Sequence, residues 1–294
     1  MRILFIGCIE SSYIQLLLLI KHKKNIVGVI TKEKSEFNSD FCDLSPICKS
    51  NNIPFIYTKN INDETTINFV KKCNPDIGYC FGWSQLIGKD VLNIPSKGII
   101  GNHPAELPYN RGRHPIIWAL ALGLESTAST FFIMNESADT GDIISQETIS
   151  IKDTDYARDL YNKINKSECR QILRFTEEFE KGTIKYIHQN STVGNSWRKR
   201  CAKDGLIDWR MSAKAIYNLI RALSAPYIGA AFLYQDREIK VWRSKAIFSQ
   251  AYNNIEPGKI IQINSTTDFI VKAYDGLVHV TQSDEFHGKE GEYL

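Results

Sequence analysis

Short apolar segments that alternate with helical stretches are the feature that most constrains the fold of this chain. Five such segments lie in its first part: Ile3–Ile6, Ile26–Ile30, Pro54–Tyr57, Ile77–Phe81 and Gly98–Gly101. Helical patterns fall between them and after them, for example over Ser12–Lys21, Thr65–Cys73 and Trp118–Leu122. Short apolar strands separated by helices are typical of a parallel sheet covered on both faces. The sequence therefore predicts an α/β domain.

The next part of the chain extends this domain. Thr127–Met134 and Ile143–Ile151 predict two more strands, and Asp155–Lys181 predicts a long helix because its apolar residues recur at helical spacing. The sequence then becomes polar and irregular, which predicts a linker over residues 186–203. We therefore expect the first domain to span residues 1–185.

The last part of the chain predicts a second, smaller domain over residues 204–294. Ser212–Leu223 has its apolar residues on one face of a helix. Five β-like segments follow: Ala230–Tyr234, Glu238–Arg243, Gly258–Ile263, Phe269–Ala273 and Leu277–Thr281. Turn sequences separate several of them, which is typical of hairpins. We expect a small β barrel or sandwich here.

Composition and charge exclude several classes of protein. Hydrophobic residues make up 43% of the 294 residues and charged residues 23%, which favours a packed core over a disordered chain. Lys+Arg 36 against Asp+Glu 33 leaves a net charge of +3, too weak to predict a nucleic-acid binder. No apolar run approaches the ~18–20 residues of a membrane span. The seven cysteines are scattered without a C-x-x-C pair, which indicates small buried side chains in a reducing cytoplasm and no zinc site.

The densest group of chemically useful side chains follows the segment Gly98–Gly101. The sequence there begins Gly101-Asn102-His103-Pro104 and ends Arg111-Gly112-Arg113-His114-Pro115. Ligands of open α/β sheets bind beyond the carboxyl ends of the strands, so this loop is well placed for a site. It could equally be a rigid surface turn whose polar residues cap backbone groups.

Two further loops carry candidate residues. The segment from Asn135 to Asp142 lies between two predicted strands, and its Asp139 could orient a histidine or accept a proton. Alone, this segment is more typical of an ordinary turn. Phe81-Gly82-Trp83-Ser84 follows another predicted strand, where the indole could wall a ligand pocket or cover the sheet edge.

Together these loops resemble the formyltransferases that use 10-formyltetrahydrofolate. The resemblance lies in Asn102-His103-Pro104, Leu107-Pro108, Arg111-Gly112 and Ala138-Asp139-Thr140-Gly141-Asp142, in this order. Asp204–Trp209, Ile220–Leu223 and Pro226–Ala230 are similar to the C-terminal part of methionyl-tRNA formyltransferase relatives. Phe81-Gly82-Trp83-Ser84 and Arg111–Pro115 are most similar to enzymes that N-formylate amino sugars carried by nucleotides.

The resemblance implies a Rossmann-like catalytic domain followed by a small C-terminal β barrel related to the OB fold. It implies that a formyl group moves from N10-formyltetrahydrofolate to the amine of a nucleotide-linked amino sugar, without a metal ion. Such a product would be a precursor of surface polysaccharide, for example lipopolysaccharide, made in the cytoplasm. Neither a membrane nor a nucleic acid is an expected partner, and a homodimer is compatible with the sequence.

The resemblance also implies roles for three residues in acyl transfer. His103 is assigned to proton transfer with the amine, and Asp139 to fixing the tautomer and charge of that histidine. The family pattern is Asn-x-His, whereas this chain has Gly101 two residues before the histidine and Asn102 directly before it. Neighbours in an extended segment point to opposite sides. Either a local bulge brings Asn102 to the developing oxyanion, or a backbone N–H or His103 itself stabilises it.

Binding residues carry over from the same resemblance. The folate is assigned to Phe81, Gly82, Trp83 and Arg113, and to Asn135, Glu136, Ser137, Ala138 and Asp139. The sugar or the phosphates of the acceptor are assigned to Glu10, Ser11, Ser12 and Arg111. Ser11 or Ser12 could equally cap a helix.

Two other interpretations stay open. A methionyl-tRNA formyltransferase would need a broad basic surface, and a net charge of +3 offers little of one. A relative that binds folate or nucleotide without catalysis is suggested by the displaced asparagine, while the intact His103 and Asp139 weigh against it. The basic run Arg198-Lys199-Arg200, with Lys203, is expected to be a solvated linker, with a phosphate contact as the lesser alternative.

Overall fold

The computed structural model describes residues 1–35, 39–190 and 192–294, and its packing divides the chain into two compact units. The first comprises Met1–Gly112, Ala128–Ile149 and Lys163–Trp197, and the second comprises Arg113–Thr127, Ser150–Asn162 and Arg198–Leu294. Two segments that the sequence placed within residues 1–185 therefore pack with the second unit. The boundaries predicted at 185 and 203 divide the chain in sequence order, and they stay a prediction.

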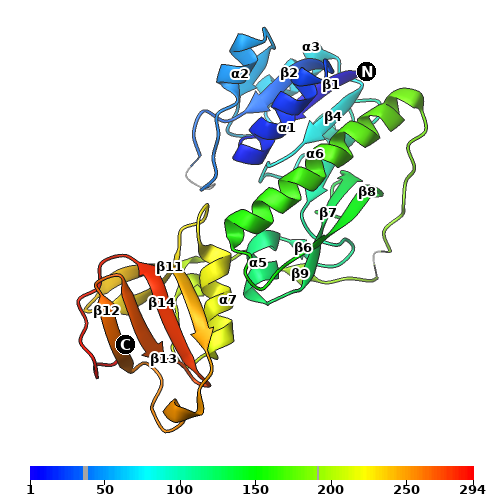
Figure 1. Cartoon of the computed structure of the whole chain (residues 1–294). Coiled ribbons are helices and arrows are strands. Elements are labelled where there is room, and N and C mark those ends of the chain that lie inside the picture. The colour runs from blue at the N-terminus through cyan, green and yellow to red at the C-terminus, as the bar shows by residue number, and fades with distance from the viewer. Residues whose placement is uncertain (36–38, 191) are drawn as a thin grey trace. The chain divides into compact units, whose positions relative to one another are not determined.

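A seven-stranded sheet forms the centre of the first unit (Figure 1). Its strands lie in the order β3 (Phe55–Tyr57), β2 (Asn25–Thr31), β1 (Arg2–Ile6), β4 (Ile77–Cys80), β5 (Ile99–His103), β7 (Ser126–Ile133) and β8 (Ile143–Ser150). The first five of these run parallel, as predicted. Strand order reverses between β1 and β4, and the carboxyl ends of strands at such a switch point are the usual ligand site of this kind of sheet.

The direction of β7 is a feature that the sequence left open. It pairs antiparallel with β5, so that Asn102 lies opposite Phe131 and His103 lies opposite Thr130. The pairing runs from Ile100 to His103 without a register shift. The end of β5 is therefore a regular strand.

Successive side chains of a strand point to opposite faces of the sheet, where they belong to two different apolar clusters. Helices cover both faces and bury these clusters. Ile3 and Phe5 of β1 belong to one cluster, whereas Leu4 and Ile6 belong to the other. The helices of the unit are α1 (Glu10–Lys21), α2 (Ser45–Ser50), α3 (Glu64–Cys73), α4 (Lys89–Leu92) and most of α6 (Ala157–Lys181). The strands and helices predicted for this part are confirmed with small shifts at their ends.

The second unit contains a five-stranded antiparallel sheet in the order β10-β11-β14-β13-β12. These strands are β10 (Ala230–Tyr234), β11 (Arg237–Ile247), β12 (Ile260–Ser265), β13 (Asp268–Lys272) and β14 (Leu277–Ser283). The unit also holds the helices α5 (Pro115–Ala121) and α7 (Ala213–Leu223), with the short η1 (Ala202–Gly205) and η2 (Gln250–Tyr252). The predicted class, an α/β part followed by a smaller β part, is confirmed.

Local sequence explains how the second unit begins its helix and fills its core. Ser212 caps α7, because its side chain accepts a hydrogen bond from the backbone N–H of Ala215. Arg221 of the same helix is buried and donates to the backbone carbonyls of Lys152 and Asp155. A buried guanidinium needs such acceptors, so this arginine fastens α7 to a distant segment of the same unit.

No helix among the described residues is both long enough and apolar enough to cross a membrane.

Candidate active site

His103, the last residue of β5, is held in one tautomer by the backbone. Only 5% of the residue is exposed, and its Nε2 lies 2.7 Å from the carbonyl oxygen of Asn110. A carbonyl oxygen can only accept a hydrogen bond, so Nε2 carries the proton and donates it. The other ring nitrogen, Nδ1, lies 3.8 Å from Oδ2 of Asp139. Any proton that Nδ1 takes up therefore faces a carboxylate.

Asp139 is positioned by the tight loop between β7 and β8. The residue has φ 59°, in the left-handed region that aspartate tolerates better than most side chains. Its Oδ2 accepts a hydrogen bond from the backbone N–H of Gly112, 3.0 Å away. Gly112 has φ +102°, and a Cβ there would lie 2.3 Å from the carbonyl oxygen of Trp197. Glycine is thus required where the backbone reaches the aspartate.

Gln189 and Arg111 clamp the loop that carries Asp139. Gln189 is only 4% exposed, and its Nε2 donates to the carbonyl oxygens of Gly141 (2.7 Å) and Asp139 (3.1 Å). Its Oε1 accepts from Arg111 Nη2 at 3.1 Å, and Arg111 Nε also donates to the carbonyl of Asp139. Three donors from two side chains thus fix this turn. The sequence assigned Arg111 to the substrate, but its guanidinium donates hydrogen bonds that hold this loop.

The segment that carries Gln189 was predicted to be part of a linker, yet much of it packs against the site. Ser196–Trp197 forms the strand β9, which pairs with β6 (Arg111–Gly112). Asn195 Oδ1 accepts from the backbone N–H of Asn110, the residue whose carbonyl holds His103. Sequence reasoning missed these residues because neither periodicity nor a motif marks them.

Asn102 lies on the opposite face of β5 from His103. Its Nδ2 donates to Oε1 of Glu168 at 2.8 Å, and Gln15 Nε2 donates to Oε2 of the same carboxylate at 2.7 Å. Glu168 is only 2% exposed, and burial raises its pKa to about 7. The local bulge that would turn Asn102 toward the histidine is not found in β5, which pairs regularly up to His103. The resemblance assigned Asn102 to the reaction, but strand alternation directs its amide to α6 instead.

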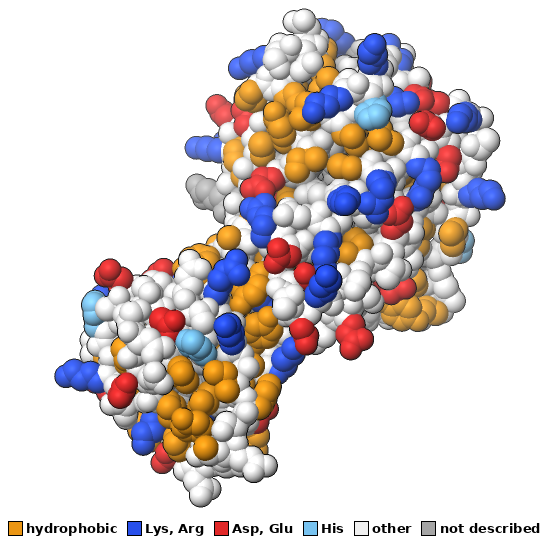
Figure 2. All heavy atoms as spheres, in the orientation of Figure 1, with side chains coloured by type: hydrophobic (Ala, Val, Ile, Leu, Met, Phe, Trp, Pro, Cys, Tyr) orange, Lys and Arg blue, Asp and Glu red, His pale blue; other side chains and the backbone are white. Residues whose placement is uncertain are grey.

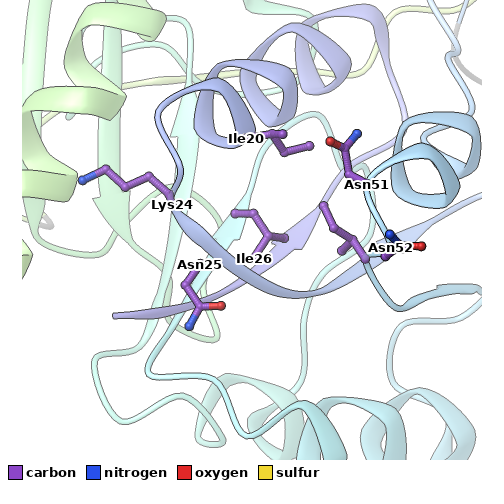
Figure 3. Close-up of a pocket in the computed structure, with 7 residues that line it drawn as sticks. Ile20, Lys24, Asn25, Ile26, Asn51 and Asn52 are labelled. Carbon is purple, nitrogen blue, oxygen red and sulfur yellow. The ribbon is translucent and has the colours of Figure 1, made fainter.

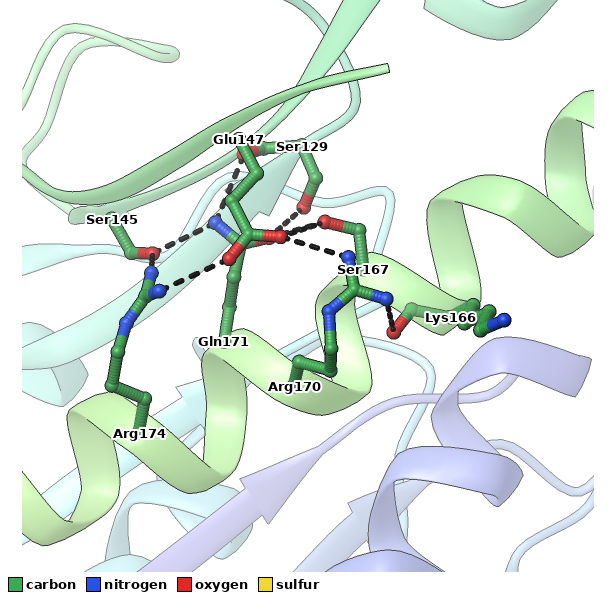
Figure 4. Close-up of polar contacts among 8 residues, drawn as sticks. All are labelled: Ser129, Ser145, Glu147, Lys166, Ser167, Arg170, Gln171 and Arg174. Carbon is green, nitrogen blue, oxygen red and sulfur yellow. Dashed lines mark hydrogen bonds and ion pairs between the residues drawn. The ribbon is translucent and has the colours of Figure 1, made fainter. Parts of the chain in front are cut away.

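A polar network fixes α6, and with it Glu168, against β7 and β8 (Figure 4). Glu147 accepts from Ser167 Oγ at 2.6 Å and from the guanidinium groups of Arg170 and Arg174, each at 3.1 Å. Gln171 adds hydrogen bonds to Ser129 and Ser145. Such a helix offers Asn102 a rigid acceptor.

Gly101 occupies the place where the family pattern has asparagine. The residue lies within the strand β5 without a positive φ, and it shares the face of β5 that carries His103. A Cβ at this position would lie 2.9 Å from Met134 Cγ and 3.1 Å from Phe132 Cζ. Two apolar side chains therefore fill the space that a side chain at residue 101 would need.

The segment Phe81-Gly82-Trp83 has one member whose side chain faces the core. Phe81 is fully buried among the rings of Phe5, Tyr79 and Phe131, and its carbonyl accepts from Ser12 Oγ at 2.6 Å. Trp83 is different, because its Nε1 is buried and has no hydrogen-bond partner among the described residues. An unpartnered buried donor is costly, so the N–H of Trp83 remains available to an acceptor atom.

The other predicted binding residues fall into three places. Ser11 and Ser12 are buried in the first turn of α1, and Ser12 Oγ accepts from the backbone N–H of Ile9. The N-cap of α1 is Ile9, so neither serine caps the helix as the alternative had it. Glu10 is half-buried at the same helix start. Asn135 Oδ1 holds Ser137 and Thr140 in a turn, and Glu136 and Ala138 of the same loop are exposed. Arg113 belongs to the second compact unit.

A pocket elsewhere in the first unit lies at the wrong edge of the sheet for this chemistry (Figure 3). Residues from the end of α1, the start of β2 and the turn after α2 line it: Ile20, Lys24, Asn25, Ile26, Asn51, Asn52 and Ile53. Asn25 and Ile26 are at the amino end of their strand, whereas His103 is at the carboxyl end of β5. Lys24 points away from the other lining residues and pairs with Glu180.

Comparison with known proteins shows the class to which this fold and site belong. The sequence model of the formyl transferase family matches residues 1–176, and that of the formyl transferase C-terminal domain matches residues 201–291. The chain is therefore a member of the formyl transferase family, and the resemblance found in the sequence is confirmed.

Three relatives make the comparison concrete. The chain is 34% identical over 266 residues to the bifunctional polymyxin resistance protein ArnA of Wigglesworthia glossinidia brevipalpis. The matching region covers 90% of this chain but only 40% of that protein. It is 32% identical over 268 residues to the methionyl-tRNA formyltransferase of Buchnera aphidicola subsp. Acyrthosiphon pisum (strain Tuc7), covering 90% of this chain and 85% of that protein. The solved structure of WlaRD, a sugar 3N-formyl transferase, covers 96% of this chain and 97% of its own with a TM-score of 0.72; at 18% identity this likeness concerns the fold.

Proposed function

We propose that this chain transfers a formyl group from N10-formyltetrahydrofolate to the amino group of a nucleotide-linked amino sugar. The observation that carries the proposal is the pairing of His103 with Asp139, in which a single tautomer leaves Nδ1 open toward a carboxylate. Acyl transfer to an amine needs a base for the proton that the amine loses, and this pair provides one.

In this proposal His103 and Asp139 divide the proton transfer between them. Nδ1 of His103 accepts the proton of the attacking amine as the new C–N bond forms, and the Asp139 carboxylate, 3.8 Å away, stabilises the imidazolium that results. The imidazolium then returns this proton to N10 of the folate as the bond between N10 and the formyl carbon breaks, so that tetrahydrofolate leaves as a neutral amine. The hydrogen bond from Nε2 to the carbonyl of Asn110 keeps the ring in place throughout. Gly112 and Gln189 hold the aspartate and its loop, so little reorganisation accompanies the change of charge.

Stabilisation of the formyl oxygen is assigned to His103 or to a backbone N–H at the end of β5. Asn102 already donates its amide to Glu168, and the side-chain space at Gly101 is filled by Met134 and Phe132. We therefore propose that Asn102 is a positioning residue, which fixes the end of β5 against α6.

The folate, when bound, supplies the formyl group. We propose that Trp83 Nε1 donates to it and that the backbone of Phe81 and Gly82 borders it. The turn from Asn135 to Asp139 is proposed to supply further backbone groups. Arg113 stays a residue that the resemblance assigns to the folate. Glu10, beside the end of β1, is proposed for the sugar.

The choice of a sugar nucleotide as acceptor is supported by charge and by the relatives. On the face shown in Figure 2, Lys and Arg side chains of the first unit are interspersed with Asp and Glu. A tRNA ligand favours a broad basic surface, and the net charge is only +3. Methionyl-tRNA formyltransferase is the second candidate, because one relative 32% identical to this chain carries that name. A cytoplasmic location, a homodimer and a role in surface polysaccharide synthesis stay predictions.

The experiment that tests the function is an acceptor screen with 10-formyltetrahydrofolate as donor. UDP-, dTDP- and GDP-linked amino sugars form one arm and methionyl-tRNA forms the other, with formylated product read by mass. We expect product with at least one amino-sugar nucleotide, formed at least about a hundredfold more slowly by the His103→Ala variant. Product with tRNA alone would favour the second candidate, and no product in either arm would favour a non-catalytic binding protein.

A further inference from the structure

A cluster of basic side chains surrounds Trp118 in the second compact unit. The guanidinium carbons of Arg198 and Arg200 lie 5.4 Å and 4.6 Å from the centroid of the indole, and Trp118 Nε1 donates to the carbonyl of Arg198 at 3.0 Å. Cation–π contacts and the hydrogen bond hold this part of the chain in one conformation. Arg198, Lys199 and Lys203 of the run predicted to be a solvated linker are exposed, and Arg200 is half-buried against the indole.

The two arginines of this cluster are paired differently. Arg198 forms a bidentate pair with the Asp204 carboxylate, in which Nη1 donates to Oδ2 at 2.7 Å and Nη2 donates to Oδ1. Arg200, which is half-buried, donates instead to the backbone carbonyl of Asp204. Asp204 thus neutralises the outer arginine directly, whereas the inner guanidinium is bonded to a neutral acceptor. A partly buried cation of this kind favours an anionic ligand.

His114, at the start of α5, adds a buried nitrogen that lacks a partner. Its Nδ1 has no hydrogen-bond partner within the part of the chain that the structure describes. Burial lowers the pKa of His114, and the positive charges of Arg113, Arg200 and Lys199 lower it further. The imidazole is therefore neutral near pH 7. An unpartnered buried nitrogen is costly, and a ligand oxygen would satisfy it in the tautomer that carries the proton on Nδ1.

We infer that Arg200, Lys199 and His114 form a binding site for a diphosphate group. Arg200 offers a planar fork that matches two phosphate oxygens, Lys199 offers a compact positive charge, and the neutral imidazole offers a hydrogen-bond donor. This inference rests on the proposed function for the identity of the ligand, because the diphosphate is the group that joins the amino sugar to its nucleoside. The positive charge of the side-chain cluster itself supports the binding of an anion.

A nucleoside diphosphate fits this cluster better than RNA does. The cations belong to one short run and to the start of one helix, so they match a single diphosphate. An RNA backbone is bound along many phosphates and would need basic residues over a longer track. Arg198, Lys199, Arg200 and Lys203 against the Asp204 carboxylate leave an excess of three positive charges in this short run.

The test is isothermal titration of the full chain with UDP, dTDP and GDP as probes. We expect Lys199→Gln to weaken binding of the preferred nucleotide about tenfold, the loss of one charge-assisted contact. Arg200→Lys keeps the charge but loses the fork, so a loss of about threefold or more is expected. Lys203→Gln is the matched control: it removes the same charge from an exposed residue of the same run and is expected to stay within about twofold. Circular dichroism confirms that each variant is folded.

Three results would overturn the inference. One is the absence of binding of UDP, dTDP and GDP to the wild-type chain, or equal affinities in wild type and both test variants. A second is weaker tetrahydrofolate binding in Lys199→Gln with nucleotide binding unchanged, which would assign the cations to the folate carboxylates. A third is weaker tRNA binding with nucleotide binding unchanged.

Turnover separates the failure of this inference from the failure of the proposed function. If an amino-sugar nucleotide is formylated with the same KM by wild type and Lys199→Gln, the diphosphate site is wrong and the proposed function stands. If nucleotide binding depends on Lys199 and Arg200 but no amino-sugar nucleotide is formylated, the site stands and the proposed reaction is wrong.

Discussion

The two faces at the end of β5 differ although their polar residues are neighbours in the sequence. His103 faces Asn110 and Asp139, both on loops that Arg111, Gln189 and Asn195 hold in place. Asn102 faces a buried glutamate on a helix that is fastened to the sheet. The first face presents a nitrogen ready to accept a proton beside a carboxylate, whereas the second face has its polar groups bonded to one another. A polar residue next to a catalytic one therefore need not share its role.

The largest expected effect comes from removing the base on the first face. We expect His103→Ala to lower kcat by roughly two to four orders of magnitude, because general acid–base catalysis contributes that much. The measurement is steady-state formylation with the acceptor found by the screen, on protein whose folding is verified by circular dichroism. Near wild-type turnover in folded His103→Ala would remove the histidine from the chemistry.

Asp139→Asn tests whether the first face needs the charge or only the shape. The amide oxygen can still accept from the N–H of Gly112, so the loop is expected to keep its form. An amide cannot stabilise an imidazolium as a carboxylate does, so we expect kcat to fall about a hundredfold with a smaller change in KM. A raised KM with unchanged kcat would assign the aspartate to binding instead.

Gln189→Ala sharpens the comparison by loosening the clamp without touching the reacting groups. It leaves the carbonyls of Asp139 and Gly141 without the Gln189 donor and Arg111 without the Gln189 acceptor. We expect kcat to fall about tenfold, and stability to fall by about 1–3 kcal/mol, the usual cost of leaving buried polar groups unpaired. Urea unfolding and turnover check both. Asn190→Ala, at the exposed neighbouring position, is the matched control, with little expected change in either quantity.

Glu168→Gln probes the second face through the pH dependence of stability. The folded-state pKa of Glu168 is raised to about 7 from an ordinary value of 4.5, so the folded protein binds this proton more tightly than the unfolded chain. That contribution to stability is present below the unfolded pKa and is lost as pH rises toward 7, on the order of 3 kcal/mol. We expect unfolding free energy to decline less between about pH 5 and pH 8 in Glu168→Gln than in wild type. Equal slopes would mean that Glu168 does not titrate in this range.

Local patterns predicted much of the fold and part of the site. Apolar periodicity and turn sequences marked most strands and helices because each is determined by a few neighbouring residues, as in the helix predicted over Ser212–Leu223. The rule that neighbours on a strand face opposite sides already indicated that Asn102 and His103 would separate. The direction of β7 was not predictable, because it depends on how distant segments pack.

The rest of the site was missed because its contacts join residues far apart in the sequence. Gln189 lies in a polar stretch without periodicity, and its partners Asp139 and Gly141 lie on another loop. Glu168 looks like an ordinary charged residue of a long helix until Asn102 and Gln15 are placed against it. Conversely, Ser12 looked available to a substrate, but its hydroxyl is buried and bonded to Phe81. Burial, which single residues do not reveal, decided these cases.

The most direct test of the central claim is the ratio of kcat for Asn102→Ala to kcat for His103→Ala, measured side by side in the same assay. If only the face with Asp139 carries the chemistry, Asn102→Ala loses about tenfold or less in kcat, whereas His103→Ala loses a hundredfold or more. A side-chain oxyanion donor would cost about 2.7–4 kcal/mol of barrier when removed. A loss of that size in folded Asn102→Ala, approaching that of His103→Ala, would contradict the account and return the asparagine to the reaction.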